Sequence, residues 1–259
     1  MAEVEQERRG AVQILRINRP EARNALNAAV IDGIGMGIEA ADADPDVRAV
    51  VITGTGDRAF CAGMDLRGFA QRAGGVQSDA DRTAAAAYNR FVREGTAKPV
   101  IAAANGSAVA GGFELLLACD MAVVSEDATF GLPEVKRALF PAGGGVFLSR
   151  RIPMAVALEL TLTGDTIGAA RALALGLVNE VVPYKDVLGQ AVALAERVTA
   201  NGPLAVQAIK TLVRAAAEQP PAEVWERQAQ LQPQIFGSAD AREGATAFIE
   251  KRAPVWQGN

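Results

Sequence analysis

The chain alternates short apolar runs with longer segments in which apolar residues recur every three or four positions. Five apolar runs, each ended by turn-forming or polar residues, predict buried strands: 11–18, 47–54, 100–106, 120–127 and 177–182. Residues 24–42 have the apolar spacing of a helix, which Asp44-Pro45 closes. Strands that alternate with helices are typical of an α/β fold rather than of a sandwich or a helical bundle.

The pattern changes after about residue 184, where the strand signals stop. Glycine and proline pairs separate four helical segments: 186–200, 203–217, 222–236 and 239–250. We therefore expect residues 1–195 to form the α/β core and residues 196–259 to form a helical region that packs on this core or on another subunit. Residues 67–80 are expected to form a mobile surface loop, followed by an alanine-rich helix.

Composition excludes several classes of protein. The 259 residues are 50% hydrophobic and 22% charged with a net charge of −4, and no dense basic run points to nucleic acid. No apolar stretch is long enough to span a bilayer, and the N-terminal residues lack the apolar core of a signal peptide. Cys61 and Cys119 lie in apolar surroundings, so we expect them to be buried rather than bridged or bound to metal. A cytoplasmic location follows as an expectation.

The chain contains no histidine. This excludes Ser-His-Asp and Cys-His nucleophile systems and any metal site that depends on histidine ligands. Proton transfer must then be carried out by carboxylates, Lys, Tyr, Cys or water.

Two glycine-containing joins lie where a strand leads into a helix: Gly111 to Glu114, and Ala62 to Leu66. Glycine lets the backbone approach a ligand closely, and the first N–H groups of a helix are free to stabilise negative charge. Two such joins that face each other would form an oxyanion hole, although the sequence does not show whether they do. Alternatively, Glu114 simply complements the helix dipole.

The two joins also follow similar strands, VVITGTG and VIAAANG. Stacked copies of one strand–turn–helix unit would produce this similarity, and so would coincidence.

Two further turns contain residues that could take part in chemistry. Glu134 follows Pro133 in a turn, and residues 141–145 form a glycine-rich turn that is a weak phosphate-loop candidate because it lacks the spacing and the lysine of a P-loop.

Taken in order, these segments resemble the crotonase superfamily, and in particular its enoyl-CoA hydratase branch. The resemblance runs from Asn18-Arg19-Pro20 to Phe248-Ile249-Glu250-Lys251-Arg252. Its most specific parts are Phe60 to Leu66, Gly111 to Glu114 with Asp120, and Phe130 to Glu134. The resemblance implies an α/β crotonase-like spiral of strand–strand–helix repeats, followed by a helical region that forms trimers or dimers of trimers.

The resemblance also implies roles for individual residues. Glu114 and Glu134 correspond to the two catalytic acids, and the Met64 and Gly111 N–H groups correspond to the oxyanion hole. The CoA thioester would contact two segments and one helix, at Arg23, Asn24, Ala25, Leu26, Ala62, Gly63, Met64, Asp65, Phe248 and Lys251. Phe248 and Lys251 would reach a CoA on a neighbouring subunit. The implied reaction is reversible hydration of an enoyl-CoA, with no metal and no cofactor beyond coenzyme A itself.

Departures from the family pattern leave the acyl specificity open. Ala138 replaces a usual glycine, residues 140–143 read Phe-Pro-Ala-Gly, and Arg23 replaces a common lysine. The C-terminal Glu250 to Trp256 tail resembles that of carnitinyl-CoA dehydratases, which makes a specialised dehydratase or an isomerase an alternative. A non-catalytic acyl-CoA-binding protein is the alternative from another class, and the presence of both acids argues against it.

Overall fold

The larger of two sheets in the described part of the chain has six strands in the order β1-β2-β3-β5-β7-β10. The computed structural model describes residues 2–65 and 79–259. The six strands are β1 (Val4–Arg9), β2 (Val12–Ile17), β3 (Ala49–Gly54), β5 (Val100–Ala104), β7 (Met121–Ser125) and β10 (Glu180–Val182). β1 pairs antiparallel with β2, and the strands from β2 to β10 pair in parallel. All residues of β3 and β5 are buried, as expected for central parallel strands covered on both faces.

The second sheet has four short strands in the order β4-β6-β8-β9. They are β4 (Ala59–Cys61), β6 (Ser107–Val109), β8 (Thr129–Gly131) and β9 (Ile167–Gly168). In three successive units a long strand leads into a short one and then into a helix: β3-β4-α3 (Asp79–Glu94), β5-β6-α4 (Gly111–Ala118) and β7-β8-η2 (Pro133–Arg137). The two segments with similar sequences are stacked, because β3 pairs with β5 and β4 pairs with β6.

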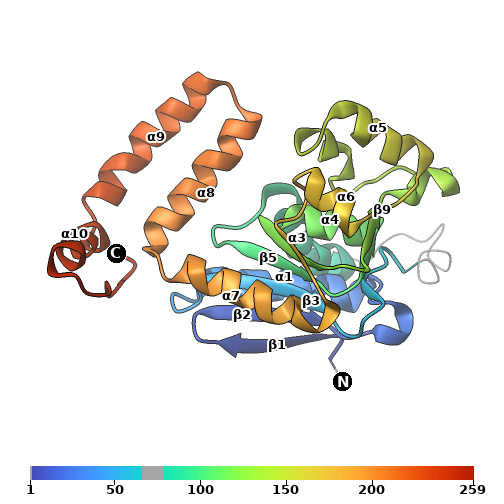
Figure 1. Cartoon of the computed structure of the whole chain (residues 1–259), viewed down its shortest axis with the longest axis horizontal. Coiled ribbons are helices and arrows are strands. Elements are labelled where there is room, and N and C mark those ends of the chain that lie inside the picture. The colour runs from blue at the N-terminus through green and yellow to red at the C-terminus, as the bar shows by residue number, and fades with distance from the viewer. Residues whose placement is uncertain (1, 66–78) are drawn as a thin grey trace.

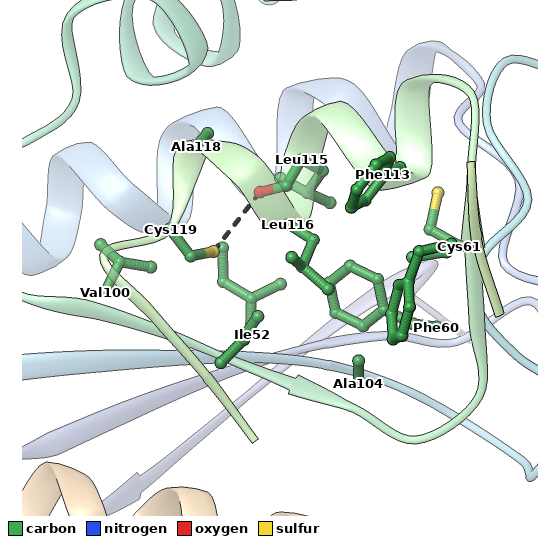
Figure 2. Close-up of a cluster of buried hydrophobic side chains, with 14 of the residues drawn as sticks. Ile52, Phe60, Cys61, Val100, Ala104, Phe113, Leu115, Leu116, Ala118 and Cys119 are labelled. Carbon is green, nitrogen blue, oxygen red and sulfur yellow. Dashed lines mark hydrogen bonds between the residues drawn. The ribbon is translucent and has the colours of Figure 1, made fainter. Parts of the chain in front are cut away.

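Apolar side chains cover both faces of the larger sheet. Successive strand residues point to opposite faces, so Val51 packs toward α7 (Val187–Thr199) and Ile52 packs toward the second sheet. The second layer also contains α1 (Ala28–Ala43), α3 and α4. Figure 2 shows its centre, where Phe60 and Phe113 lie beside Leu116 on α4. This packing fixes α4 on the sheet.

Apart from η1, the remaining helices of the described residues lie after the third unit. They are η3 (Gly145–Arg150), α5 (Met154–Thr163), α6 (Ala169–Ala174), η4 (Tyr184–Asp186), α8 (Pro203–Glu218), α9 (Pro221–Phe236) and α10 (Ala239–Glu250), and a short η1 (Pro20–Ala22) precedes α1. α8 and α9 form a hairpin that extends away from the sheets (Figure 1). α9 has no buried residue, and α8 buries only Ala215. The C-terminal tail joins the body through the Trp256 indole, which donates to the Ala200 carbonyl at 2.8 Å.

All five predicted strands form, with ends that shift by up to three residues. The predicted helix over 24–42 is wrong in its first turn. The helix begins at Ala28 because the Asn27 side chain accepts the Val30 N–H, while Arg23 and Asn24 adopt left-handed backbone conformations. The surface loop expected over 67–80 lies outside the described residues except for 79 and 80, which begin α3.

The sequence patterns did not predict several elements. These are β1, the short strands of the second sheet, α5 and α6. β1 reads VEQERR and is mostly exposed, so it lacks the alternation of a half-buried strand. The short strands have only two or three residues, too few for a periodic pattern.

Candidate active site

Two backbone nitrogens from different strand–helix joins, those of Met64 and Gly111, lie close together. A Cβ atom placed on Gly111 would lie 3.7 Å from the Met64 nitrogen, and one on Gly63 would lie 3.1 Å from the Gly111 nitrogen. Leu26 donates to the Gly63 carbonyl and accepts from the Asp65 N–H, so the Met64 N–H between them points away from Leu26. Gly111 is the first residue of α4, and its N–H has no acceptor within the helix. The Met64 and Gly111 N–H groups are therefore the candidate donors of an oxyanion hole.

The turn before Gly111 is held in an uncommon conformation. Ala110 has φ 51° and ψ −132°, a region that L-residues rarely adopt. Its N–H donates to the Gly131 carbonyl at 2.9 Å, and its carbonyl accepts from both Phe113 and Glu114. These bonds fix the turn from both sides. They also join the start of α4 to the strand that leads to Glu134.

Glu114 lies in the first turn of α4, and it is 7% exposed. Its Oε1 accepts the Gly143 N–H at 2.7 Å and the Gly145 N–H at 2.9 Å. Two N–H groups of the glycine-rich turn at residues 141–145 therefore bind the Glu114 side chain. Both donors are backbone N–H groups, so Oε1 acts as an acceptor.

Glu134 lies in the first turn of η2 in a different environment. Its Oε2 is buried and has no hydrogen-bond partner among the described residues. Burial raises the pKa of the Glu134 carboxyl above its usual 4.5, and the nearby Glu114 raises it further, while Arg137 opposes the shift. One carboxyl group thus accepts two backbone hydrogen bonds, whereas burial raises the pKa of the other.

The two segments predicted to bind CoA lie side by side. The Ala62 N–H donates to the Arg23 carbonyl at 3.1 Å, and Leu26 pairs with the segment around Met64 in a parallel bridge. The Asp65 carboxylate pairs with Arg19 at 3.1 Å. Residues 23–26 and 62–65 thus form one surface beside the paired N–H groups.

The side chains of these two segments face different ways. Asn24 is buried, and its amide donates to the carbonyls of Thr55 and Ala59, so its side chain supports the loop from inside. Ala25 and Leu26 are buried as well, whereas Arg23 is exposed. A hollow of about 100 Å³ adjoins Arg23 and is also lined by Arg58. Arg58 could not be predicted from the sequence, because a lone arginine in a turn carries no motif.

Within a single chain, Phe248 and Lys251 do not lie at this site. They lie at the end of α10, on the opposite side of the molecule from α4 (Figure 1). Phe248 is 85% exposed, and Lys251 is exposed with φ 55° as the left-handed cap of the helix.

A cavity of about 790 Å³ adjoins Glu114 on the face of α4 that also carries Leu117 and Ala118. The other walls come from the end of α3, from η3 and from α8, with Leu148 and Val213 among the apolar lining. The volume lies in the range of small-molecule binding sites.

Cys61 and Cys119 are free and buried, as expected. Burial raises the pKa of both thiols to about 12. The Cys119 thiol donates to the Leu115 carbonyl within α4 (Figure 2). Both residues therefore contribute to packing as thiols.

Of the helices in the described part of the chain, none combines the length and the apolar character needed to span a bilayer.

Comparisons with known proteins agree with this architecture. The family model for enoyl-CoA hydratase/isomerase matches residues 7–259. The enoyl-CoA hydratase EchA19 of Mycobacterium tuberculosis is 42% identical over 253 residues, which cover 97% of this chain and 95% of that protein. A carnitinyl-CoA dehydratase of Proteus mirabilis is 40% identical over 255 residues, covering 96% of each chain. The crystal structure of an enoyl-CoA hydratase from M. tuberculosis H37Rv superposes with a TM-score of 0.91 and 43% identity, covering 100% of both chains.

The fold is therefore the α/β spiral of crotonase-type enzymes. The chain belongs to the enoyl-CoA hydratase/isomerase family.

Proposed function

We propose that the protein is an enoyl-CoA hydratase that adds water reversibly across the 2,3 double bond of an enoyl-CoA thioester. The observation that carries this proposal is the pair of glutamates in unlike environments, next to two converging N–H groups. Glu114 is held as an acceptor by two backbone donors, while burial raises the pKa of Glu134. Two acids in different protonation states are what the addition of water requires.

The thioester carbonyl would accept hydrogen bonds from the Met64 and Gly111 N–H groups. When hydroxide adds to C3, negative charge develops on the thioester oxygen, where these donors stabilise it. Removal of one such donor typically lowers the rate by roughly 10²–10³. The Gly111 N–H also lies at the positive end of the α4 dipole, which adds to the stabilisation.

The two glutamates divide the proton transfers. Glu114 accepts a proton from water as the oxygen–C3 bond forms, and the carboxyl of Glu134 gives its proton to C2. After product release, one proton must pass from Glu114 to Glu134 before the next turnover. The residues need no metal or redox cofactor for these steps, and coenzyme A enters only as part of the substrate.

The CoA portion would lie along residues 23–26 and 62–65. Arg23 and Arg58 flank the small hollow there and supply positive charge for phosphate groups. Asn24, Ala25 and Leu26 would contribute through their backbone, since their side chains are buried.

The helical region at 196–259 is proposed to form the interface of a trimer or a dimer of trimers. Large apolar side chains remain exposed on it, including Trp225 (66%), Phe236 (73%) and Ile249 (78%). A monomer rarely leaves such residues uncovered together. Within an assembly, Phe248 and Lys251 would reach a CoA on a neighbouring subunit. A cytoplasmic location stays a prediction.

A second candidate is a specialised dehydratase. The P. mirabilis relative, named carnitinyl-CoA dehydratase, is 40% identical over almost the whole chain. An enoyl-CoA isomerase on the same scaffold and a non-catalytic acyl-CoA-binding protein are the other candidates.

The deciding experiment is a rate panel that follows the absorbance of the conjugated enoyl thioester, which falls when an enoyl-CoA is hydrated and rises when a hydroxyacyl-CoA is dehydrated. The panel contains crotonyl-CoA, long-chain and bulky enoyl-CoA thioesters, and carnitinyl-CoA. Hydration of an enoyl-CoA supports the proposal, and turnover of carnitinyl-CoA alone supports the dehydratase. A protein that binds these thioesters but turns over none would be a binding protein.

A further inference from the structure

Asp120 follows the catalytic helix α4, and the mechanism above gives it no role. Its side chain is 15% exposed. One oxygen accepts the Val100 N–H at 2.8 Å and lies 2.7 Å from the Lys210 ammonium, and the other lies 2.8 Å from the Arg214 guanidinium. Both cations come from α8, the first helix after the α/β core. The carboxylate thus links α8 to the end of α4.

Two arginines also bind the last carbonyls of α4. Arg214 donates to the Ala118 carbonyl at 3.0 Å. Arg151, at the end of η3, donates to the Leu117 carbonyl at 2.9 Å and to the Cys119 carbonyl at 3.4 Å. Cations at the C-terminal end of a helix satisfy its free carbonyls and complement its dipole.

The segment that ends in Arg151 begins at the turn of residues 141–145, which binds the Glu114 side chain and is called the cradle from here on. The Gly145 N–H donates to Glu114 near the start of α4, and Arg151 binds carbonyls at its end. Residues 143–151 therefore run along α4 and hold it at both ends. Any shift of this segment along the helix would move the Gly143 and Gly145 donors relative to the Glu114 carboxylate.

We propose that Asp120, Arg151, Lys210 and Arg214 form a clamp that positions α4 and its cradle for catalysis, and thereby couples the C-terminal helical region to the active site. The four residues are positioning residues, because none of them lies at the reacting atoms. The clamp acts on Gly111 and Glu114 together, since both lie on α4. Both groups act mainly in the transition state, so loosening the clamp lowers kcat more than it raises KM.

The test compares Arg214→Met and Arg151→Met with a matched control, Arg150→Met. Arg150 pairs with Glu218 at 3.2 Å, so it also links η3 to α8, but it makes no hydrogen bond to α4. Each variant is assayed at the oligomeric state of the wild type. Because misplacing a catalytic group by about 1 Å can cost on the order of 10²-fold, we expect Arg214→Met and Arg151→Met to lower kcat about tenfold or more. KM should change less than about twofold, and Arg150→Met should retain wild-type kcat.

If all three variants lose kcat equally, the general attachment of α8 matters rather than the clamp. An unchanged kcat in Arg214→Met and Arg151→Met would overturn the clamp. If Arg214→Met fails to fold, Arg214→Lys replaces it, since lysine keeps the charge but cannot reach Asp120 and the Ala118 carbonyl together. A folded Arg214→Lys with normal kcat then refutes the clamp.

The kinetic readout rests on the proposed hydratase function, so a second measurement is independent of turnover. Amide hydrogen exchange of residues 111–119 and 141–147 should be faster in Arg214→Met and Arg151→Met than in Arg150→Met. If the wild type has no hydratase activity but the variants show these differences in exchange, the proposed function is wrong and the clamp is supported. Unchanged exchange in these segments refutes the clamp.

Discussion

The Gly143 N–H donates to Oε1 of Glu114 at 2.7 Å, and a Cβ atom on Gly143 would lie 2.8 Å from the other oxygen of the same carboxylate. The glycine thus supplies a donor and leaves room for the acid that it binds. Its φ lies outside the left-handed region, so the absence of a side chain reflects contact rather than backbone conformation. In this chain Gly143 is a steric requirement for the position of Glu114.

We therefore expect Gly143→Ala to fold normally but to lower kcat by roughly 10- to 100-fold, because the new methyl group displaces the Glu114 carboxylate. The matched control is Gly189→Ala in α7, where a Cβ atom meets nothing within 4 Å. This control should keep full activity and gain up to about 1 kcal/mol of stability from helix propensity. Steady-state kinetics and thermal unfolding check both. A fully active Gly143→Ala variant would contradict this prediction, because the alanine side chain would then fit beside the Glu114 carboxylate.

Glu114→Gln and Glu134→Gln should each lower turnover by roughly 10²–10⁴, the usual contribution of a general acid or base. Acyl-CoA binding, measured by calorimetry with a saturated thioester, should survive both changes, because neither carboxyl is needed to hold the CoA. Near-normal hydration by either variant would rule out the two-acid mechanism.

Glu134 should also make stability depend on pH. Burial raises the pKa of its carboxyl in the folded protein above the usual 4.5, so the folded state binds this proton more tightly than the unfolded chain does. The stability that this provides is fully present below about pH 4.5 and is lost as the pH rises through the raised pKa. Glu134→Gln should therefore raise the Tm at about pH 8 and change it little at about pH 4. The same Tm shift at both pH values would contradict this assignment.

Gly63 should matter more to the oxyanion hole than the Met64 side chain does. Gly63 has φ +86°, and a Cβ atom there would lie 2.8 Å from the Ala110 Cβ and 3.1 Å from the Gly111 nitrogen. Gly63→Ala should push the Met64 and Gly111 donors apart and lower kcat on the order of 10²-fold. Met64→Leu should be mild, because only the Met64 backbone is used and its side chain is 49% exposed. Equal effects of the two changes would remove Met64 from the proposed oxyanion hole.

The sequence predicted the parts of the fold that carry long apolar patterns. Five of the six strands of the larger sheet were found because buried parallel strands are continuous apolar runs. The two- and three-residue strands of the second sheet were missed because their structure comes from stacking on neighbouring units. Similar joins after β3 and β5 suggested a repeat, but only the pairing of β4 with β6 brings Met64 and Gly111 together.

The candidate site was also predicted only in part from the sequence. Glu114 and Glu134 were selected through family motifs, since a glutamate near a helix start has an ordinary structural explanation. The turn at residues 141–145 was only a weak phosphate-loop candidate, and its contact with Glu114 was not predicted, because Gly143 and Glu114 are 29 positions apart in the chain. The clamp could not be predicted either, since Asp120 and Arg214 are separated by 94 positions.

Lys251 tests the proposal that α10 binds CoA on a neighbouring subunit. Lys251 has φ 55°, a conformation that glycine adopts at no cost, so Lys251→Gly removes the ammonium while it preserves the helix cap. Loss of a phosphate contact should raise KM for an acyl-CoA severalfold, most strongly at low salt, with little change in kcat. A pantetheine thioester, which lacks the nucleotide, should be unaffected. Lys185→Ala, which removes an exposed lysine from η4, serves as the charge control and should leave both KM values unchanged. If Lys251→Gly raises KM equally for acyl-CoA and for the pantetheine thioester, then Lys251 does not contact the nucleotide phosphate.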